Sequence, residues 1–271
     1  MSSQHRQCIV CGSQSPSLLL RKDGYSIVRC QQCAFVYVGE EPSLIDFGSI
    51  YGEAYYKGGN DQVFADYLGQ ECGRRAGARR RLWALRLMRP RGRLLDVGCA
   101  AGFFLVEAQR HYEVKGVEFS EFSSHFAREH FGLDVFTGSL AQARLPSAHF
   151  DLITLWDVIE HVPDPDVVLA EAARLLRPGG RLVLTTGDIG SAYAQRRGVK
   201  WHLLAPPWHL YYFSRKTITR LGANAGLRVT ACQARGVAGD GRLARSRPAI
   251  ALSNLLGLGD IMQVTFARVE T

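Results

Sequence analysis

From about residue 92 onward, two patterns of apolar residues alternate along the chain. Short apolar runs are separated by longer segments whose apolar residues recur every three or four positions. The first pattern is typical of buried strands and the second of amphipathic helices. The runs predict strands at Leu94–Val97, Val114–Glu118, Asp134–Thr137, Asp151–Leu155, Arg181–Thr186, Leu227–Cys232 and Met262–Val269.

This alternation predicts a parallel sheet with helices on both faces. We therefore expect a doubly wound α/β fold with a mostly parallel, seven-stranded, Rossmann-like sheet. Between the last two strands there is no clear helix beyond Ala249–Leu258, so the last strand is expected to be antiparallel.

The first third of the chain has a different pattern. Residues 40–68 are rich in aromatic residues and glycine with no single period, which is typical of a linker and a capping segment. A helix is predicted over Gln70–Met88, ended by Pro90 and Gly92. We expect a small N-terminal module at 1–45, a capping segment and basic helix at 46–92, and the main domain at 93–271.

Four cysteines in two pairs mark the N-terminal module. The pairs Cys8–Cys11 and Cys30–Cys33 are separated by eighteen residues, and short strands are predicted between them. Four thiolates at this spacing form a tetrahedral sulfur site, which suits zinc and leaves no open position. A segment of about 40 residues cannot stabilise itself by apolar burial alone. The pattern therefore predicts a zinc ribbon with a structural zinc ion.

Composition excludes several classes of protein. Hydrophobic residues make up 46% and charged residues 21%, as in globular proteins and unlike disordered chains. No apolar run is long enough for a membrane span, and the polar N-terminus lacks a signal-peptide core. We therefore expect a cytoplasmic protein, in which its seven cysteines serve as metal ligands or buried thiols.

The positive charge is concentrated in one segment. The net charge is +8, yet Arg74–Arg93 alone holds nine arginines and no acidic residue, so the rest of the chain is nearly neutral. This segment is interpreted either as a solvated helix face or as a patch for a phosphate-bearing substrate or partner.

Several motifs, in order, resemble those of class I S-adenosylmethionine (SAM)-dependent methyltransferases. Residues 94–102, Leu-Leu-Asp-Val-Gly-Cys-Ala-Ala-Gly, are similar to the family's first motif, with Ala100 in place of the middle glycine. A methyl group fits there if φ is negative. Phe150–Val162 resembles the fourth-strand motif, and Leu176–Gly180 resembles the turn before the fifth strand.

The resemblance implies SAM as the cofactor and assigns positions that bind it. Gly98 would let the backbone approach the amino-acid tail, Asp96 would contact its ammonium group, and Glu118 would accept both ribose hydroxyls. Adenine would lie against the residues after the third strand. The positions expected to bind the cofactor are Asp96, Gly98, Cys99, Ala100, Gly102, Glu118, Phe119, Ser139, Leu140, Trp156 and Asp157.

Three polar residues after the fourth strand allow three interpretations. Asp157, Glu160 and His161 have the i, i+3, i+4 spacing that places side chains on one helical face. Similar positions bind a divalent metal in quinone O-methyltransferases. Alternatively, Glu160 and His161 brace the helix and loop beneath the cofactor. In the third interpretation His161 is a catalytic base.

Residues 188–214 are expected to form a lid over the acceptor. Within it, His209 resembles the histidine of a His-x-x-Tyr-Phe-Ser motif in zinc-containing sugar C-methyltransferases, although Trp208 replaces their glutamate. The resemblance implies that His209 is the general base, with Tyr55 or Tyr56 arriving from the capping segment. The alternative is a lid histidine bonded to backbone.

The leading hypothesis is a methyltransferase acting on a small-molecule acceptor, at a hydroxyl or carbon of a sugar, nucleotide-sugar or natural-product intermediate. The alternative is an RNA methyltransferase that holds nucleic acid with its zinc ribbon and Arg74–Arg93. A non-catalytic SAM-binding module is a third hypothesis.

Overall fold

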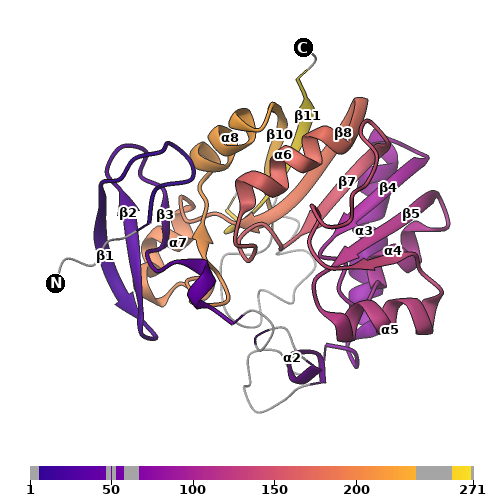
Figure 1. Cartoon of the computed structure of the whole chain (residues 1–271), viewed down its shortest axis with the longest axis horizontal. Helices are drawn as coiled ribbons and strands as arrows, with labels where there is room; N and C mark the ends of the chain where they lie inside the picture. The colour runs from indigo at the N-terminus through magenta and orange to yellow at the C-terminus, as the bar shows by residue number, and fades with distance from the viewer. Residues whose placement is uncertain (1–5, 47–49, 51–52, 58–66, 236–257, 270–271) are drawn as a thin grey trace.

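The computed structural model describes residues 6–46, 50, 53–57, 67–235 and 258–269. Among these residues the chain forms two sheets, a seven-stranded sheet flanked by helices and a four-stranded sheet near the N-terminus (Figure 1). No helix in these ranges is long and apolar enough to cross a membrane.

The seven-stranded sheet confirms the predicted fold class. Its order is β10-β11-β8-β7-β4-β5-β6. The pairs formed by β4, β5, β6, β7 and β8 are parallel, whereas β11 runs antiparallel to both β8 and β10. The strands are β4 (Gly92–Val97), β5 (Tyr112–Glu118), β6 (Val135–Thr137), β7 (Phe150–Trp156), β8 (Leu176–Gly187), β10 (Leu227–Arg235) and β11 (Ile261–Arg268).

The largest difference from the predicted strand bounds is at the start of β8. Strand β8 begins at Leu176 rather than at Arg181, because the Pro-Gly-Gly turn forms a bulge inside the strand. The pairing with β7 moves from Phe150–Leu176 to Leu152–Arg181 across this bulge. The last strand in sequence, β11, is antiparallel as predicted and lies between β8 and β10.

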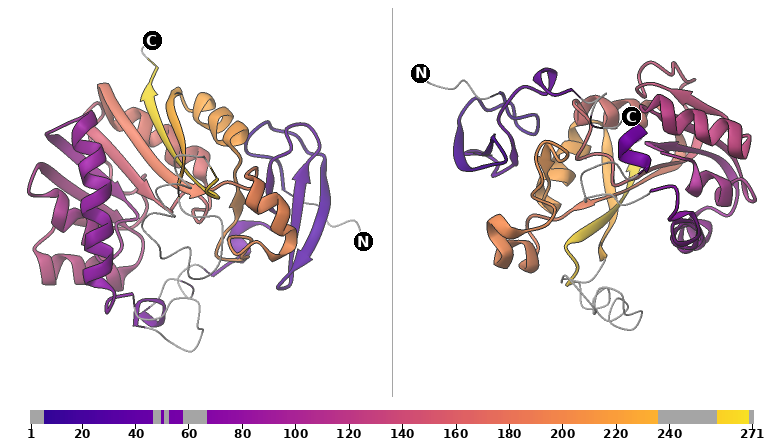
Figure 2. Two further views of the ribbon diagram at one scale, coloured as in Figure 1. Left: turned by 180° about the vertical axis from the view of Figure 1, so that it is seen from behind. Right: turned by 90° about the horizontal axis from the view of Figure 1, so that it is seen from below.

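Helices cover both faces of the sheet (Figures 1 and 2). On one face lie α3 (Glu71–Met88), α4 (Phe103–Ala108) and α5 (Glu121–Phe131), and on the other α6 (Pro165–Leu175) and α8 (Arg215–Asn224). Alternate strand residues pack on opposite sides: Leu94 and Leu152 lie in the cluster of α3 and α4, Leu95 and Ile153 in that of α6 and α8. Because both faces are covered, the strands are nearly continuous apolar runs, which is the pattern that predicted them.

The N-terminal sheet includes two strands that the sequence did not predict, its third and its fourth. Its order is β1 (Pro16–Lys22), β2 (Tyr25–Cys30), β3 (Val36–Val38) and β9 (Tyr211–Tyr212), all antiparallel. Strand β9 comes from the segment after β8, which also forms α7 (Ala192–Arg197) and η2 (Gly198–Lys200). The N-terminal sheet thus shares one hydrophobic cluster with the α6 and α8 side of the large sheet.

A buried arginine, Arg6, stabilises the junction between the N-terminal sheet and the segment after β8. The Arg6 guanidinium carbon lies 5.4 Å from the ring centre of Tyr37 and 4.7 Å from that of Tyr211. One of its nitrogens donates a hydrogen bond to the Tyr211 hydroxyl at 2.8 Å. Two further short elements, η1 (Pro42–Leu44) and α2 (Glu53–Lys57), lie between the module and α3.

Candidate active site

The loop after β4 carries the first group of expected cofactor residues. Asp96 is buried and accepts a hydrogen bond from the Thr154 hydroxyl at 2.6 Å, and burial raises its pKa to about 7. The Gly98 N–H donates to the Val117 carbonyl at 2.8 Å, which ties the loop to β5. Gly98 has a φ of +69°, and a Cβ there would lie 2.5 Å from a Val158 methyl, so only glycine fits.

The remaining loop positions are placed by local geometry. Gly102 adopts a φ of +80° at the N-cap of α4, and the Cys99 side chain packs in the core against Gly116. The expectation of a negative φ at Ala100 is wrong, because the φ of this residue is +48°. An L-residue in this left-handed region costs about 1 kcal/mol. The Ala100 N–H offsets part of this cost with a 2.8 Å hydrogen bond to Glu118.

Glu118 joins the loops after β4 and β5. Its carboxylate accepts hydrogen bonds from the backbone N–H groups of Ala100 and Ser120, both at 2.8 Å. Burial raises its pKa, and these N–H groups partly oppose that shift. Neither Asp96 nor Glu118 forms a salt bridge with any residue that the structure describes. Two buried carboxyl groups without a cationic partner suit a positively charged ligand.

The other expected cofactor positions lie in the loops after β5, β6 and β7. Phe119 is 56% exposed, and Leu140 is buried. Ser139 is exposed and exchanges hydrogen bonds with Gln142. These positions follow neighbouring parallel strands, so they lie along the same carboxyl edge of the sheet.

Trp156 and Asp157 end β7 at this edge. The Trp156 ring packs edge-on against Phe104, and the Arg81 guanidinium lies 4.7 Å from its centre. Asp157 has a φ of +57° and accepts a 2.8 Å hydrogen bond from the Thr185 hydroxyl. A second Asp157 oxygen lies 3.4 Å from Arg81. Aspartate tolerates this left-handed conformation better than most residues.

A partly buried group of three residues lies beside this edge. Glu160, His161 and His209 each offer a ligand atom, and these atoms lie within 4.8 Å of one another. The two imidazole rings meet edge to face with centres 4.6 Å apart. Glu160 and His161 follow β7, whereas His209 comes from the segment after β8. The structure therefore gathers His209, and not Asp157, with the other two.

Hydrogen bonds define the tautomers of both histidines. The His161 Nδ1 lies 2.7 Å from the Trp208 carbonyl, and the His209 Nδ1 lies 2.6 Å from the Leu203 carbonyl. A carbonyl oxygen only accepts, so each Nδ1 carries the proton and each Nε2 is unprotonated in the neutral ring.

The pKa shifts in this group follow from burial. Burial lowers the pKa of His161 to about 3, with a contribution from His209, and it lowers the pKa of His209 as well. Both rings are therefore neutral near pH 7. Burial and the nearby Asp157 raise the pKa of Glu160 to about 8, and its Oε2 has no hydrogen-bond partner among the described residues. Such a group can accept a proton or hold a metal ion.

The tyrosines expected from the capping segment lie in helix α2. Tyr56 is buried, and its ring centre lies 5.4 Å from that of Tyr67 and 5.9 Å from that of Phe122. This places Tyr56 against α5. The side chain of Tyr55 lies outside the described residues.

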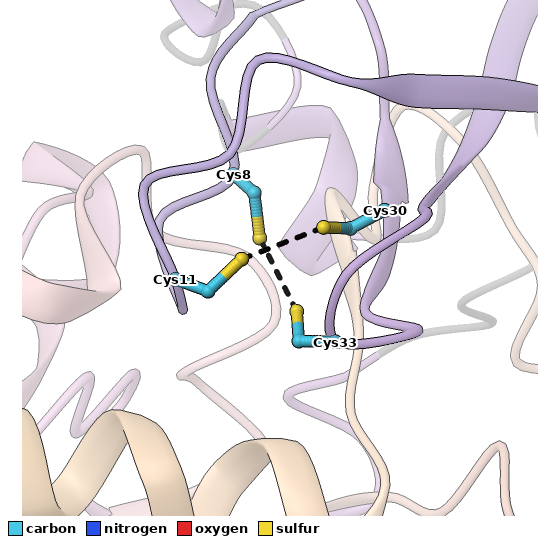
Figure 3. Close-up of side chains that lie close together, drawn as sticks. All are labelled: Cys8, Cys11, Cys30 and Cys33. Carbon is cyan, nitrogen blue, oxygen red and sulfur yellow. Dashed lines mark hydrogen bonds between the residues drawn. The ribbon is translucent and has the colours of Figure 1, made fainter.

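The four N-terminal cysteines converge, as their spacing predicts (Figure 3). The Cys8 and Cys33 sulfurs are 3.5 Å apart, as are those of Cys11 and Cys30. A tetrahedral site with Zn–S bonds of about 2.3 Å has sulfur–sulfur edges of about 3.8 Å, so the spacing fits a metal ion. Burial raises the pKa of Cys30, but the N–H groups of Cys33 and Gln32 help to bring it down to about 7.

Two residues that hold this site, Thr154 and Thr185, were not identified from the sequence. The Thr154 hydroxyl donates a hydrogen bond to Asp96, and the Thr185 hydroxyl donates one to Asp157. Thr154 lies within the Phe150–Val162 motif, where a hydroxyl in a mainly apolar run was the available signal. The role of β9 was also missed. Its neighbour Leu210 donates to the Glu160 carbonyl and accepts from the Val38 N–H, both at 2.8 Å. The four-stranded sheet is therefore bonded directly to the group containing Glu160.

Comparisons with known proteins agree with this geometry. A family model described as a methyltransferase domain matches residues 69–231. Ubiquinone biosynthesis O-methyltransferase of Azoarcus sp. is 37% identical over 101 residues, 35% of this chain and 43% of the relative. The enzyme of that name from Nitrosococcus oceani is 32% identical over 145 residues, 46% of this chain and 61% of the relative. The chain thus spans less than two thirds of the length of these curated relatives.

Solved structures show the same fold. A SAM-dependent methyltransferase of Thermotoga maritima, described as a possible histamine N-methyltransferase, gives a TM-score of 0.54 at 23% identity, covering 74% of this chain and 93% of that one. A SAM-dependent methyltransferase of Archaeoglobus fulgidus gives 0.55 at 18% identity, covering 74% and 98%. At these identities the likeness concerns the fold alone.

Proposed function

The chain belongs to the methyltransferase-domain family, and on that premise we propose that it transfers the methyl group of SAM to a small-molecule acceptor. One observation carries the proposal. Asp96 and Glu118 are buried carboxyl groups that form no ion pair with another described residue. They lie at the same sheet edge as the group of Glu160, His161 and His209.

The cofactor half of the site fits the chemistry of SAM. When bound, SAM supplies an electrophilic methyl group on a positively charged sulfonium. Asp96 pairs with the ammonium of the amino-acid tail, Gly98 leaves room for it beside the backbone, and Glu118 accepts the ribose hydroxyls with its free lone pairs. Phe119, Ser139 and Leu140 line the adenine side. These roles follow the family resemblance and the positions of the loops.

The acceptor half supplies a proton acceptor. His209 is neutral near pH 7, and its Nδ1–H is bonded to the Leu203 carbonyl, which leaves the Nε2 lone pair available. A hydroxyl acceptor bound there would give its proton to this nitrogen. SAM, when bound, would supply the methyl group and leave as S-adenosylhomocysteine. The curated relatives are named as O-methyltransferases, which favours a hydroxyl over a carbon acceptor.

The same three side chains favour a second role, as ligands of a divalent metal. Their ligand atoms lie within 4.8 Å of one another, and both histidines donate their Nδ1–H to carbonyls, an arrangement common around metal sites. A chelator distinguishes the roles. Loss of activity that is restored by a divalent ion assigns metal binding, and unchanged activity assigns proton transfer.

For the four N-terminal cysteines we propose one structural zinc ion per chain. Elemental analysis should find it, and Cys30→Ser should unfold the N-terminal module. A protein that contains no metal and has a Cys8–Cys11 disulfide in reduced lysate would exclude this site.

The RNA alternative rests on the nine arginines of Arg74–Arg93. Several of them are already paired within the fold: Arg75 and Arg79 bind Glu107, and Arg81 contacts Asp157. We therefore expect only weak RNA binding that disappears near physiological salt. A salt-resistant, submicromolar complex with a defined RNA would favour the alternative.

The proposal is tested by incubating the protein with isotopically labelled SAM and separate pools of small molecules and RNA. Mass spectrometry should find the label in a small molecule and not in RNA. Label in RNA alone would contradict the proposal.

A further inference from the structure

Helix α3 has an outward face that the proposed reaction does not use. It is the outermost element on its side of the sheet (Figure 2, left). On its inner side the side chains of Ala78, Leu82 and Leu85 are buried. On the outer side, Trp83 is 66% exposed and Leu87 is 71% exposed. These residues are four positions apart, so they lie on one face of the helix.

Arginines flank these two apolar side chains. Arg80 and Arg86 lie three residues before and after Trp83 and are exposed. Within the described part of the chain, neither forms a hydrogen bond or a salt bridge. By contrast, Arg75 and Arg81, on the inner side, are paired with acidic residues. We call Arg80, Trp83, Arg86 and Leu87 the outer strip of α3.

We propose that the outer strip docks α3 flat on an anionic membrane surface. Trp83 and Leu87 enter the boundary between headgroups and acyl chains, and Arg80 and Arg86 contact lipid phosphates. An interfacial helix combines these features: large apolar side chains on one face and arginines beside them. The charge complements that of anionic lipids, and α3, with its eighteen residues, is about 27 Å long.

A membrane fits the strip better than a protein or RNA does. A stable protein interface needs about 800 Å² on each partner, which is more than one narrow helical strip provides. Binding of single-stranded RNA relies on aromatic side chains that stack on successive bases. The strip has one aromatic residue, and Leu87 neither stacks on bases nor binds phosphate. A lipid surface needs no shape complementarity.

Docking would place the candidate site close to the lipid. The inner side of α3 reaches the site through Arg81, which contacts Trp156 and Asp157. The site would then lie about one helix diameter, roughly 10 Å, from the membrane surface. This suits an acceptor drawn from the lipid phase, although the inference rests on the surface of α3 and not on the proposed reaction.

Vesicle binding of the full-length protein tests this inference. We would compare phosphatidylcholine vesicles with vesicles that contain about one third phosphatidylglycerol. The variants are Arg80→Gln/Arg86→Gln and Trp83→Ala/Leu87→Ala. Arg220→Gln/Arg228→Gln is the matched control, because it removes the same charge from exposed positions on α8 and β10.

We expect co-sedimentation with anionic vesicles only, weakening with salt. Loss of Arg80 and Arg86 should lower partitioning about 30-fold, from about fivefold per arginine, and the control should lower it far less. Trp83→Ala/Leu87→Ala should also lower it and abolish a blue shift of tryptophan fluorescence. Equal binding to neutral vesicles, no binding, or an equal effect of the control would overturn the proposal. So would tighter binding to a single-stranded RNA that Arg80→Gln/Arg86→Gln removes. Thermal unfolding of each variant verifies its fold.

Discussion

The two halves of the candidate site are built from contacts of very different range. In the cofactor half, Asp96, Gly98 and Glu118 sit in consecutive strand–loop units, and Glu118 bonds directly to the loop before it. In the acceptor half, His209 joins Glu160 and His161 from a distant segment that is itself paired with the N-terminal sheet. The cofactor half is thus a local product of the sequence, whereas the acceptor half depends on the whole fold.

The largest expected effect is a loss of kcat after a substitution in the acceptor half. Replacing His209 with alanine should lower kcat by about 10²–10⁴, because it removes the proton acceptor, while SAM affinity stays the same. Steady-state kinetics and calorimetry measure both quantities. His125→Ala, at an exposed position on α5, is the control and should retain activity. An active His209→Ala variant would show that His209 is not the proton acceptor, and His161 would be the next candidate.

A substitution in the cofactor half should instead lower the affinity for SAM. Glu118→Ala should weaken SAM binding by about 1.5–3 kcal/mol, since two hydrogen bonds to a carboxylate are lost. Calorimetric titration checks this value, and Glu121→Ala, at the exposed start of α5, is the control. Unchanged affinity for Glu118→Ala would mean that the ribose is held elsewhere.

The junction of the two sheets should affect stability and not cofactor affinity. Tyr211→Phe removes a hydroxyl that accepts from Arg6 and donates to the Pro163 carbonyl. The buried Arg6 then loses a partner, so the free energy of unfolding should fall by about 1–2 kcal/mol. Denaturant unfolding measures this change. A loss of SAM affinity in the same variant would show that the cofactor half also depends on the contact between the two sheets.

The smallest effect is a pH dependence of SAM binding. The pKa of Asp96 is about 7, and its ionised form is the one that pairs with an ammonium group. As the pH falls below 7, Asp96 must release a proton on binding, so affinity should drop by up to about tenfold per pH unit. The raised pKa of Glu118 acts in the same direction.

Substitutions at Asp96 and Thr154 test which group causes this pH dependence. Asp96→Asn should weaken binding and flatten the slope. Thr154→Val should move the slope to higher pH, because the Thr154 hydroxyl stabilises the ionised carboxylate. A slope that Asp96→Asn leaves intact would assign the titration to another group.

Prediction from the sequence succeeded where structure is local. The sheet followed from short apolar runs that alternate with helical segments, and the cysteine group followed from the spacing of two Cys-x-x-Cys pairs. It was wrong about φ at Ala100, because the constraint comes from Glu118 on the neighbouring strand. It also missed β9, since a strand of two residues has no periodicity of its own and forms by pairing with β3.

A crystal structure with S-adenosylhomocysteine would locate both halves of the site relative to the sulfur. We expect the ribose hydroxyls on Glu118 and the His209 Nε2 within about 8 Å of the sulfur, close enough for one bridging water. A ribose bound elsewhere, or a His209 beyond that distance, would show that the proposed site is wrong.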